Sequence, residues 1–226
     1  PQDWTVSLEG AGIHPSLENS CDQAIITSKS KDTNELAQLA TFLTKGPVLS
    51  LQNGLGNLEI IKQYAFENAA VGVTTNAVKK LQPGHIEWVG KGDLIVGGPK
   101  GEAFAKTLEC LAATYNPDVS SVLWNKLLLN VAINPLAAIC GVKNGELRYE
   151  PLLSQAESTM LEAASVARLL GINIGSDQEL LQNLHSVLNS TSDNICSMLA
   201  DVRLGKETEI DMLCGQVVSR AEQLGI

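Results

Sequence analysis

The spacing of apolar and polar residues changes character near the middle of this 226-residue chain. In the first half, short runs rich in β-branched residues lie between turns. They predict strands at about 23–27, 47–52, 70–75, 85–89 and 93–96. Helical spacing predicts helices at about 34–44 and 58–64. Strands that alternate with helices are typical of a parallel α/β sheet, so the first half is expected to form an α/β domain.

The second half has the apolar spacing of helices. Helices are predicted at about 102–114, 120–139, 151–170, 178–202 and 207–224. Turn-forming residues separate several of them, for example at 116–118 and 143–145. The predicted domains are therefore residues 1–117, which are α/β, and residues 118–226, which are all-α.

The helix predicted at 120–139 carries three polar residues on an otherwise apolar segment. Lys126, Asn130 and Asn134 are spaced by four, so they share one helix face. Either they form a site, or they belong to a core helix whose asparagines bond to backbone and whose lysine reaches solvent. A membrane span fits the length, but polar and charged groups near its middle argue against one.

Composition and charge restrict the class of partner. The net charge of −9 argues against nucleic acid and against an anionic membrane surface, so a small-molecule partner is expected. The five cysteines are scattered and form no CxxC pair. We therefore expect neither a metal site nor a disulfide framework. The cysteine pattern favours a cytoplasmic location. The chain shows no signal peptide and does not begin with Met, so it is expected to be a segment of a longer protein.

A glycine-rich turn, QNGLGN at 52–57, follows the second predicted strand. Ligands of open α/β sheets bind at the carboxyl ends of strands, which makes Asn53 a candidate for a cofactor contact. The pair Asn53-Gly54 also simply favours a turn. The sequence leaves both interpretations open.

A second polar cluster lies between Asn194 and Asp211. Asn194 and Ser197 are three residues apart and would share a helix face. Glu209 lies near a predicted helix start, where the helix dipole favours an acidic residue. It could also pair with Lys126, because a buried ammonium group requires a counter-charge.

Taken in order, these motifs resemble the ketopantoate reductase (2-dehydropantoate 2-reductase) family. The matching motifs are QNGLGN at 52–57, WNKL at 124–127 with Asn130 and NPL at 134–136, NGEL at 144–147, NICSM at 194–198, Asp201, and TEID at 208–211. The resemblance implies a partial NADP-binding Rossmann domain followed by an all-α domain of the 6-phosphogluconate dehydrogenase C-terminal type. It also implies NADPH-dependent reduction of 2-dehydropantoate to pantoate, a step in pantothenate and coenzyme A biosynthesis.

The resemblance also implies roles for individual residues. Lys126 would donate a proton to the substrate's carbonyl oxygen, and Glu209 would act beside it as a second catalytic residue. The implied substrate-binding residues are Lys126, Asn130, Asn134, Asn144, Asn194 and Ser197. The implied cofactor-binding residues are Lys29, Asn53, Glu209 and, through its backbone, Val78.

The chain also departs from the family pattern. It contains no GxGxxG fingerprint and no basic residue placed to select a 2′-phosphate, and it stops before the family's C-terminal segment. These 226 residues alone are therefore expected to bind NADPH weakly and to show little reductase activity. The alternatives are a reductase of another 2-keto acid and a non-catalytic module used for dimerisation, such as a homodimer, or for ligand binding. Distant β-hydroxyacid dehydrogenases lack the pattern between Asn194 and Asp211.

Overall fold

The computed structural model describes residues 21–82 and 85–226 and divides the chain into two compact units. The first unit contains the described residues up to Ser28, then Asp32–Gln52 and Asn57–Val119. The second contains Lys29–Lys31, Asn53–Gly56 and Ser120–Ile226. Two short loops from the first half of the chain thus belong, by their contacts, to the second unit. The predicted division into residues 1–117 and 118–226 did not include these two loops in the second unit.

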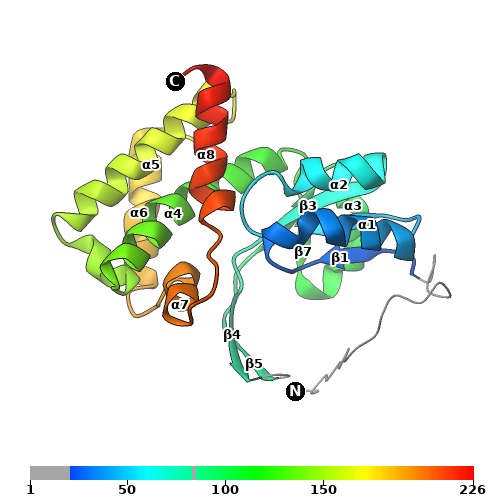
Figure 1. The fold of residues 1–226 in the computed structure, drawn as a ribbon, viewed down its shortest axis with the longest axis horizontal. Helices are drawn as coiled ribbons and strands as arrows, with labels where there is room; N and C mark the ends of the chain where they lie inside the picture. Colours follow the sequence, from blue (N-terminus) through cyan, green and yellow to red (C-terminus); the bar gives the residue numbers. More distant parts are fainter. Residues whose placement is uncertain (1–20, 83–84) are drawn as a thin grey trace. The chain divides into compact units, whose positions relative to one another are not determined.

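The first unit is built on a five-stranded sheet (Figure 1). Its strands, in spatial order, are β1 (Ala24–Ile26), β2 (Val48–Ser50), β3 (Ala69–Thr74), β6 (Leu94–Gly97) and β7 (Ala113–Tyr115). All neighbours pair in parallel except β3 and β6, which are antiparallel. The predicted α/β fold is confirmed, although the sheet is mixed rather than wholly parallel.

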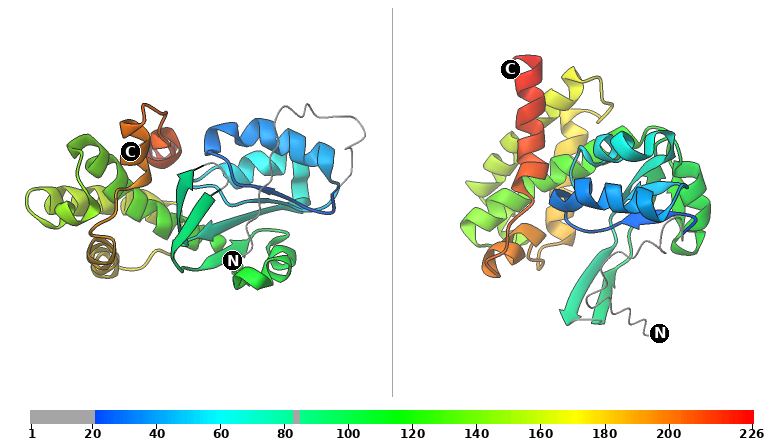
Figure 2. Two further views of the ribbon diagram at one scale, coloured as in Figure 1. Left: turned by 90° about the horizontal axis from the view of Figure 1, so that it is seen from below. Right: turned by 45° about the vertical axis from the view of Figure 1, so that its right-hand side comes forward.

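Helices cover both faces of this sheet (Figure 2). They are α1 (Thr33–Leu43), α2 (Asn57–Ala65) and α3 (Gly101–Thr107), with short 3-10 turns at Ser30–Asp32, Phe66–Asn68 and Glu109–Leu111. Successive strand residues point to opposite faces, so Val48 packs with α1 and α2, while Leu49 packs with Phe104 of α3. Burial on both faces explains why these strands read as short continuous apolar runs.

Two strands form a separate antiparallel hairpin, β4 (Ala77–Gln82) and β5 (His85–Gly90). The strand predicted at 85–89 is therefore present, but it lies outside the main sheet. Strand β4 was not predicted, because two lysines at 79 and 80 interrupt its apolar pattern.

The helix predicted at 102–114 is wrong beyond Thr107. The chain instead turns through Ala112, whose φ of 55° lies in the left-handed region, and continues as β7. Residues Ala113 to Tyr115 pair with Leu94 to Val96 of β6. Pairing with a distant strand overrides the local helical pattern here, and no local sequence signal contains that information.

The second unit is helical. Its elements are α4 (Val119–Cys140, whose first residue falls in the first unit), a 3-10 helix at Asn144–Arg148, α5 (Leu152–Leu169), α6 (Asp177–Ser190), α7 (Ser197–Arg203) and α8 (Ile210–Leu224). They enclose one apolar core, in which Leu128, Leu147 and Leu184 are fully buried. The all-α second half is thus confirmed.

The single helix predicted at 178–202 is two helices, α6 and α7. The connecting residues from Thr191 to Asp193 are polar, and their side chains compete with the backbone hydrogen bonds of a helix. Asn194 lies in this connection and Ser197 is the first residue of α7. The expectation that they share a helix face is therefore wrong.

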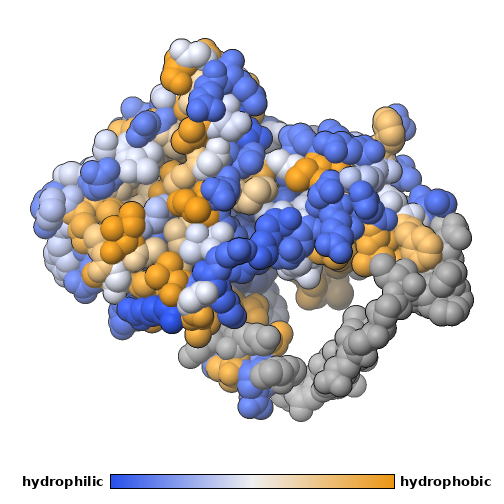
Figure 3. All heavy atoms as spheres, in the orientation of Figure 1, coloured by the Kyte–Doolittle hydropathy of each residue, from blue (hydrophilic) through white to orange (hydrophobic). Residues whose placement is uncertain are grey.

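Helix α4 is the one helix among the described residues that is long and apolar enough to cross a membrane. The core helix of a soluble protein passes the same test, and Leu127, Leu128 and Val131 of α4 are buried within the second unit. Figure 3 shows hydrophilic side chains interspersed with hydrophobic ones on the surface that it draws. The structure thus supports a core helix.

Candidate active site

Lys126, the candidate proton donor, belongs to the second unit. It lies on α4 beside the buried residues Leu127 and Leu128, and its Nζ donates a hydrogen bond to Asn53 Oδ1 at 2.8 Å. Burial lowers the pKa of Lys126 below its ordinary value, and the carboxylate of Glu209 raises it in part. A lysine with a lowered pKa gives up its proton more readily than one in water, which suits a general acid.

A glycine turn brings Asn53 to the lysine. Gly54 has a φ of 81°, which favours glycine, and a Cβ at this position would lie 2.3 Å from the carbonyl oxygen of Met212 in α8. The turn can therefore lie directly against the first turn of α8. The QNGLGN motif thus serves close packing as well as turn formation, and it carries Asn53 to a lysine 73 residues away.

Glu209 is the third member of this group. It is the residue that immediately precedes α8. Asn53 Nδ2 donates to Glu209 Oε2 at 3.5 Å, and the backbone N–H of Ser30 donates to Glu209 Oε1 at 3.5 Å. The carboxamide of Asn53 therefore contacts the ammonium group through its oxygen and the carboxylate through its nitrogen. We call Lys126, Asn53, Glu209 and Ser30 the lysine cluster; all four belong to the second unit.

The loop Lys29–Lys31 also contacts the segment that precedes α8. Lys29 Nζ forms an ion pair with Asp201 at 2.7 Å and donates to the carbonyl oxygen of Glu207 at 3.0 Å. Lys31 pairs with the carboxylate of Glu207. The sequence had assigned only Lys29 to the site. The strand-end rule could also have indicated Ser30 and Lys31. Their loop follows β1 just as Asn53 follows the neighbouring parallel strand β2.

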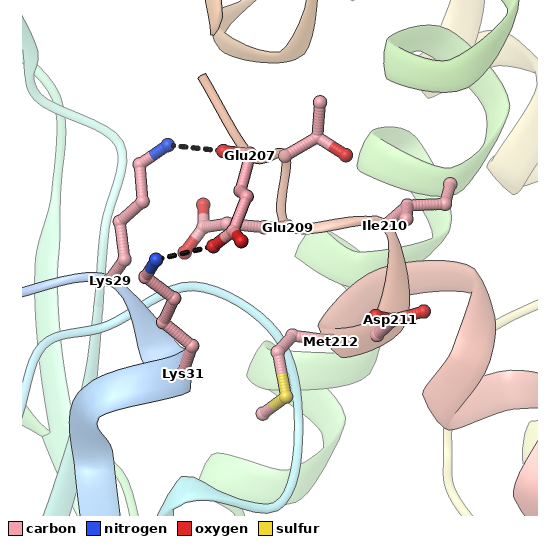
Figure 4. A pocket seen from close by; sticks show the side chains of 8 residues that line it. Lys29, Lys31, Glu207, Glu209, Ile210, Asp211 and Met212 are labelled. Atoms are coloured by element: carbon pink, nitrogen blue, oxygen red, sulfur yellow. Dashed lines mark hydrogen bonds and ion pairs between the residues drawn. The ribbon is translucent and has the colours of Figure 1, made fainter.

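A pocket of about 430 Å³ lies beside these residues (Figure 4). In Figure 4, dashed lines join Lys29 to the backbone carbonyl oxygen of Glu207 and Lys31 to the carboxylate of Glu207, with the carboxylate of Glu209 beside them. The full lining is Lys29, Lys31, Glu207, Thr208, Glu209, Ile210, Asp211 and Met212. Ammonium and carboxylate groups together suit a ligand that carries both hydrogen-bond donors and acceptors, such as an amide or a sugar hydroxyl.

Several predicted substrate residues are linked to one another near the far end of α4. The backbone N–H of Asn144 donates to the carbonyl oxygen of Asn194 at 3.1 Å, and its side-chain nitrogen donates to Thr191 Oγ1 at 3.0 Å. Cys196 Sγ lies 3.6 Å from the carbonyl oxygen of Asn134. Asn144 Oδ1 is buried without a hydrogen-bond partner among the described residues. Such an orphaned acceptor fits a bound hydroxyl group or water.

The other predicted site residues have less defined surroundings. Asn130 is partly buried on α4, one turn from Lys126, and Ser197 is exposed at the start of α7. Asn134 lies two turns from Lys126, roughly 12 Å along the helix axis. Val78 lies on β4 in the first unit, with an exposed side chain. Their assigned contacts stay predictions. Among the described residues, no group of three or more His, Cys, Asp or Glu side chains could hold a metal ion.

The sequence of this chain matches one family of known proteins. Residues 118–226 match the family described as ketopantoate reductase PanE/ApbA C terminal, and residues 6–101 match ketopantoate reductase PanE/ApbA. The 2-dehydropantoate 2-reductase of Archaeoglobus fulgidus is 32% identical over 93% of this chain and 73% of its own length. The chain belongs to the ketopantoate reductase family.

Further relatives support this membership in the ketopantoate reductase family. The 2-dehydropantoate 2-reductase of Pyrococcus horikoshii is 34% identical over 91% of the chain and 70% of its own length. The crystal structure of a PanE/ApbA family ketopantoate reductase from Ralstonia eutropha has a TM-score of 0.83 and 31% identity over 94% of this chain and 72% of that one. D-mandelate dehydrogenase, solved with NADH and anilino(oxo)acetate, shares the fold with a TM-score of 0.83 at 23% identity, covering 91% and 71% of the two chains.

Proposed function

We propose that this protein reduces 2-dehydropantoate to pantoate with NADPH, and that Lys126 is its general acid. The observation that carries the proposal is the lysine cluster, in which an ammonium group of lowered pKa contacts an amide beside a carboxylate. The names of its relatives support the substrate. We further infer that residues 1–117 contribute mainly to cofactor binding and residues 118–226 mainly to substrate binding.

A reduced nicotinamide, when bound, supplies a hydride to the carbonyl carbon of the keto acid. The protein must then provide a proton at the carbonyl oxygen, where negative charge develops. Lys126 has that proton, and Asn53 Oδ1 orients its ammonium group by accepting a hydrogen bond from it. Transfer of the proton converts the carbonyl group to the hydroxyl group of the product and leaves a neutral amine, which partial burial favours.

The residues present fit the nicotinamide end of a dinucleotide. The pocket beside Lys29 and Glu209 offers donors and acceptors for a carboxamide and a ribose. Asn130, Asn134, Asn144, Asn194 and Ser197 would hold the keto acid, and Asn144 Oδ1 is an acceptor suited to its hydroxyl group. A cytoplasmic location and a homodimer stay predictions, which fractionation and sedimentation would check.

The test is the oxidation of NADPH in the presence of 2-dehydropantoate by the protein expressed from its complete reading frame. Lys126→Ala should lower kcat by about two orders of magnitude or more, the usual scale for a lost general acid. Lys126→Arg should be nearly as poor, because a guanidinium group keeps the charge but does not release its proton. Lys106→Ala removes an exposed lysine from α3 and should retain activity.

Near-normal turnover by soluble Lys126→Ala would remove the lysine from the mechanism. A panel of other branched 2-keto acids tests the substrate separately. If one of them gives a much higher kcat/KM than 2-dehydropantoate, the reaction class stands and the assigned substrate is wrong.

A further inference from the structure

Ser30 contacts Asn53 and Glu209, two groups that act on the proposed catalytic lysine. Its hydroxyl group donates to the backbone carbonyl oxygen of Asn53 at 2.6 Å, and its backbone N–H donates to Glu209 Oε1 at 3.5 Å. Only 2% of Ser30 is exposed to solvent. Within the lysine cluster, this buried residue thus contacts Asn53 and Glu209, the two groups that act on Lys126.

The surroundings of Lys126 depend on segments that are far apart in the chain. Its hydrogen-bond acceptor, Asn53, comes from the glycine turn, and its counter-charge, Glu209, comes from the residue before α8. Neither is fixed by α4 itself. The hydroxyl group of Ser30 joins the loop Lys29–Lys31 to the turn that carries Asn53 and thereby restricts where both partners of the lysine can lie.

We propose that Ser30 is a positioning residue, which holds Asn53 and Glu209 in the arrangement from which Lys126 transfers its proton. The inference rests on the proposed function for its kinetic consequence. The ordering of the cluster itself can be measured without turnover.

The charges around the lysine give the expected direction of the effect. Glu209 raises the pKa of Lys126 against the lowering effect of burial. The cations on the loop that carries Ser30 already have acidic partners, as Lys29 pairs with Asp201 and Lys31 with Glu207. If Asn53 and Glu209 become less well placed, the pKa of Lys126 should therefore fall further.

The test is Ser30→Ala in the protein expressed from its complete reading frame. We expect kcat to fall about tenfold, which corresponds to roughly 1.4 kcal/mol of transition-state stabilisation, and KM for the keto acid to change less than about twofold. The basic limb of the pH profile of kcat should move to lower pH. Acylation of Lys126 by acetic anhydride at a series of pH values, followed by mass spectrometry, reports the same pKa without turnover.

Thr44→Val is the matched control. Thr44 is 2% exposed at the end of α1, and its hydroxyl group accepts a hydrogen bond from the backbone N–H of Gly46 at 2.9 Å, so the substitution removes a buried hydrogen bond outside the lysine cluster. It should lower stability but leave the pKa of Lys126 in place. If Ser30→Ala does not fold, Ser30→Cys keeps most of the side-chain volume with a weak donor and should change kcat and the pKa in the same direction.

Wild-type kcat and an unshifted pKa in folded Ser30→Ala, or in Ser30→Cys if the alanine variant does not fold, would overturn the inference. An equal pKa shift in Thr44→Val would do the same, because it would show a general effect of lost stability. If the wild-type protein reduces no 2-keto acid, the proposed function fails, while the acylation experiment still decides whether Ser30 positions the cluster.

Discussion

Replacing Gly54 by alanine tests the contact that places Asn53. The native φ of 81° should cost an alanine about 1–2 kcal/mol in conformational energy. The new Cβ would also lie 2.3 Å from the carbonyl oxygen of Met212, inside contact distance of helical backbone that cannot move aside easily. Relieving such an overlap typically costs a further 1–3 kcal/mol. We therefore expect a loss of about 2–5 kcal/mol in the free energy of unfolding.

Gly171 separates these two contributions. Its φ is 75°, close to that of Gly54, but a Cβ built on it meets nothing within 4 Å. Gly171→Ala should therefore show the conformational cost alone. Urea unfolding, followed by far-ultraviolet circular dichroism, measures the free energy of unfolding of both variants, because the second unit is helical. The reasoning is refuted if Gly54→Ala is no more destabilising than Gly171→Ala.

Two further predictions concern the lysine and the cofactor. Glu209→Gln removes the attraction that raises the pKa of Lys126, so that pKa should fall. Because the proposed mechanism uses the protonated lysine, the basic limb of the kcat/KM profile should then move to lower pH. A basic limb at the wild-type pH would contradict the pairing of Lys126 with Glu209. Separately, the 226-residue polypeptide should bind NADPH weakly in calorimetry, and addition of a strand and GxGxxG turn from a relative should strengthen binding. Micromolar affinity without that turn would contradict this prediction.

The sequence predicted the elements that have a strong local period. Helix α4 and its face of Lys126, Asn130 and Asn134 follow directly from a spacing of four residues. The strands β2 and β3 were equally clear, because both faces of the sheet are covered and the strands are uniformly apolar. In these segments local preference and tertiary packing agree.

The missed elements are those in which distant contacts decide. Ala113 to Tyr115 became a strand only because β6 offers a pairing edge. The break between α6 and α7 depends on polar residues from Thr191 to Asp193, where the hydroxyl group of Thr191 donates to the carbonyl oxygen of Val187. A pattern read along the chain cannot weigh either effect, since both depend on what the backbone meets elsewhere.

The site shows the same limit at the level of single residues. The strand-end rule marked Asn53 as a candidate ligand contact, and a buried lysine implied an acidic partner such as Glu209. No sequence rule distinguished Ser30 from Ser28 or the other serines that follow strands. What separates it is its almost complete burial and its 2.6 Å hydrogen bond to Asn53, which exist only after two loops have met on the second unit. A proton donor can be recognised by its residue type, whereas the groups that orient it must be found in three dimensions.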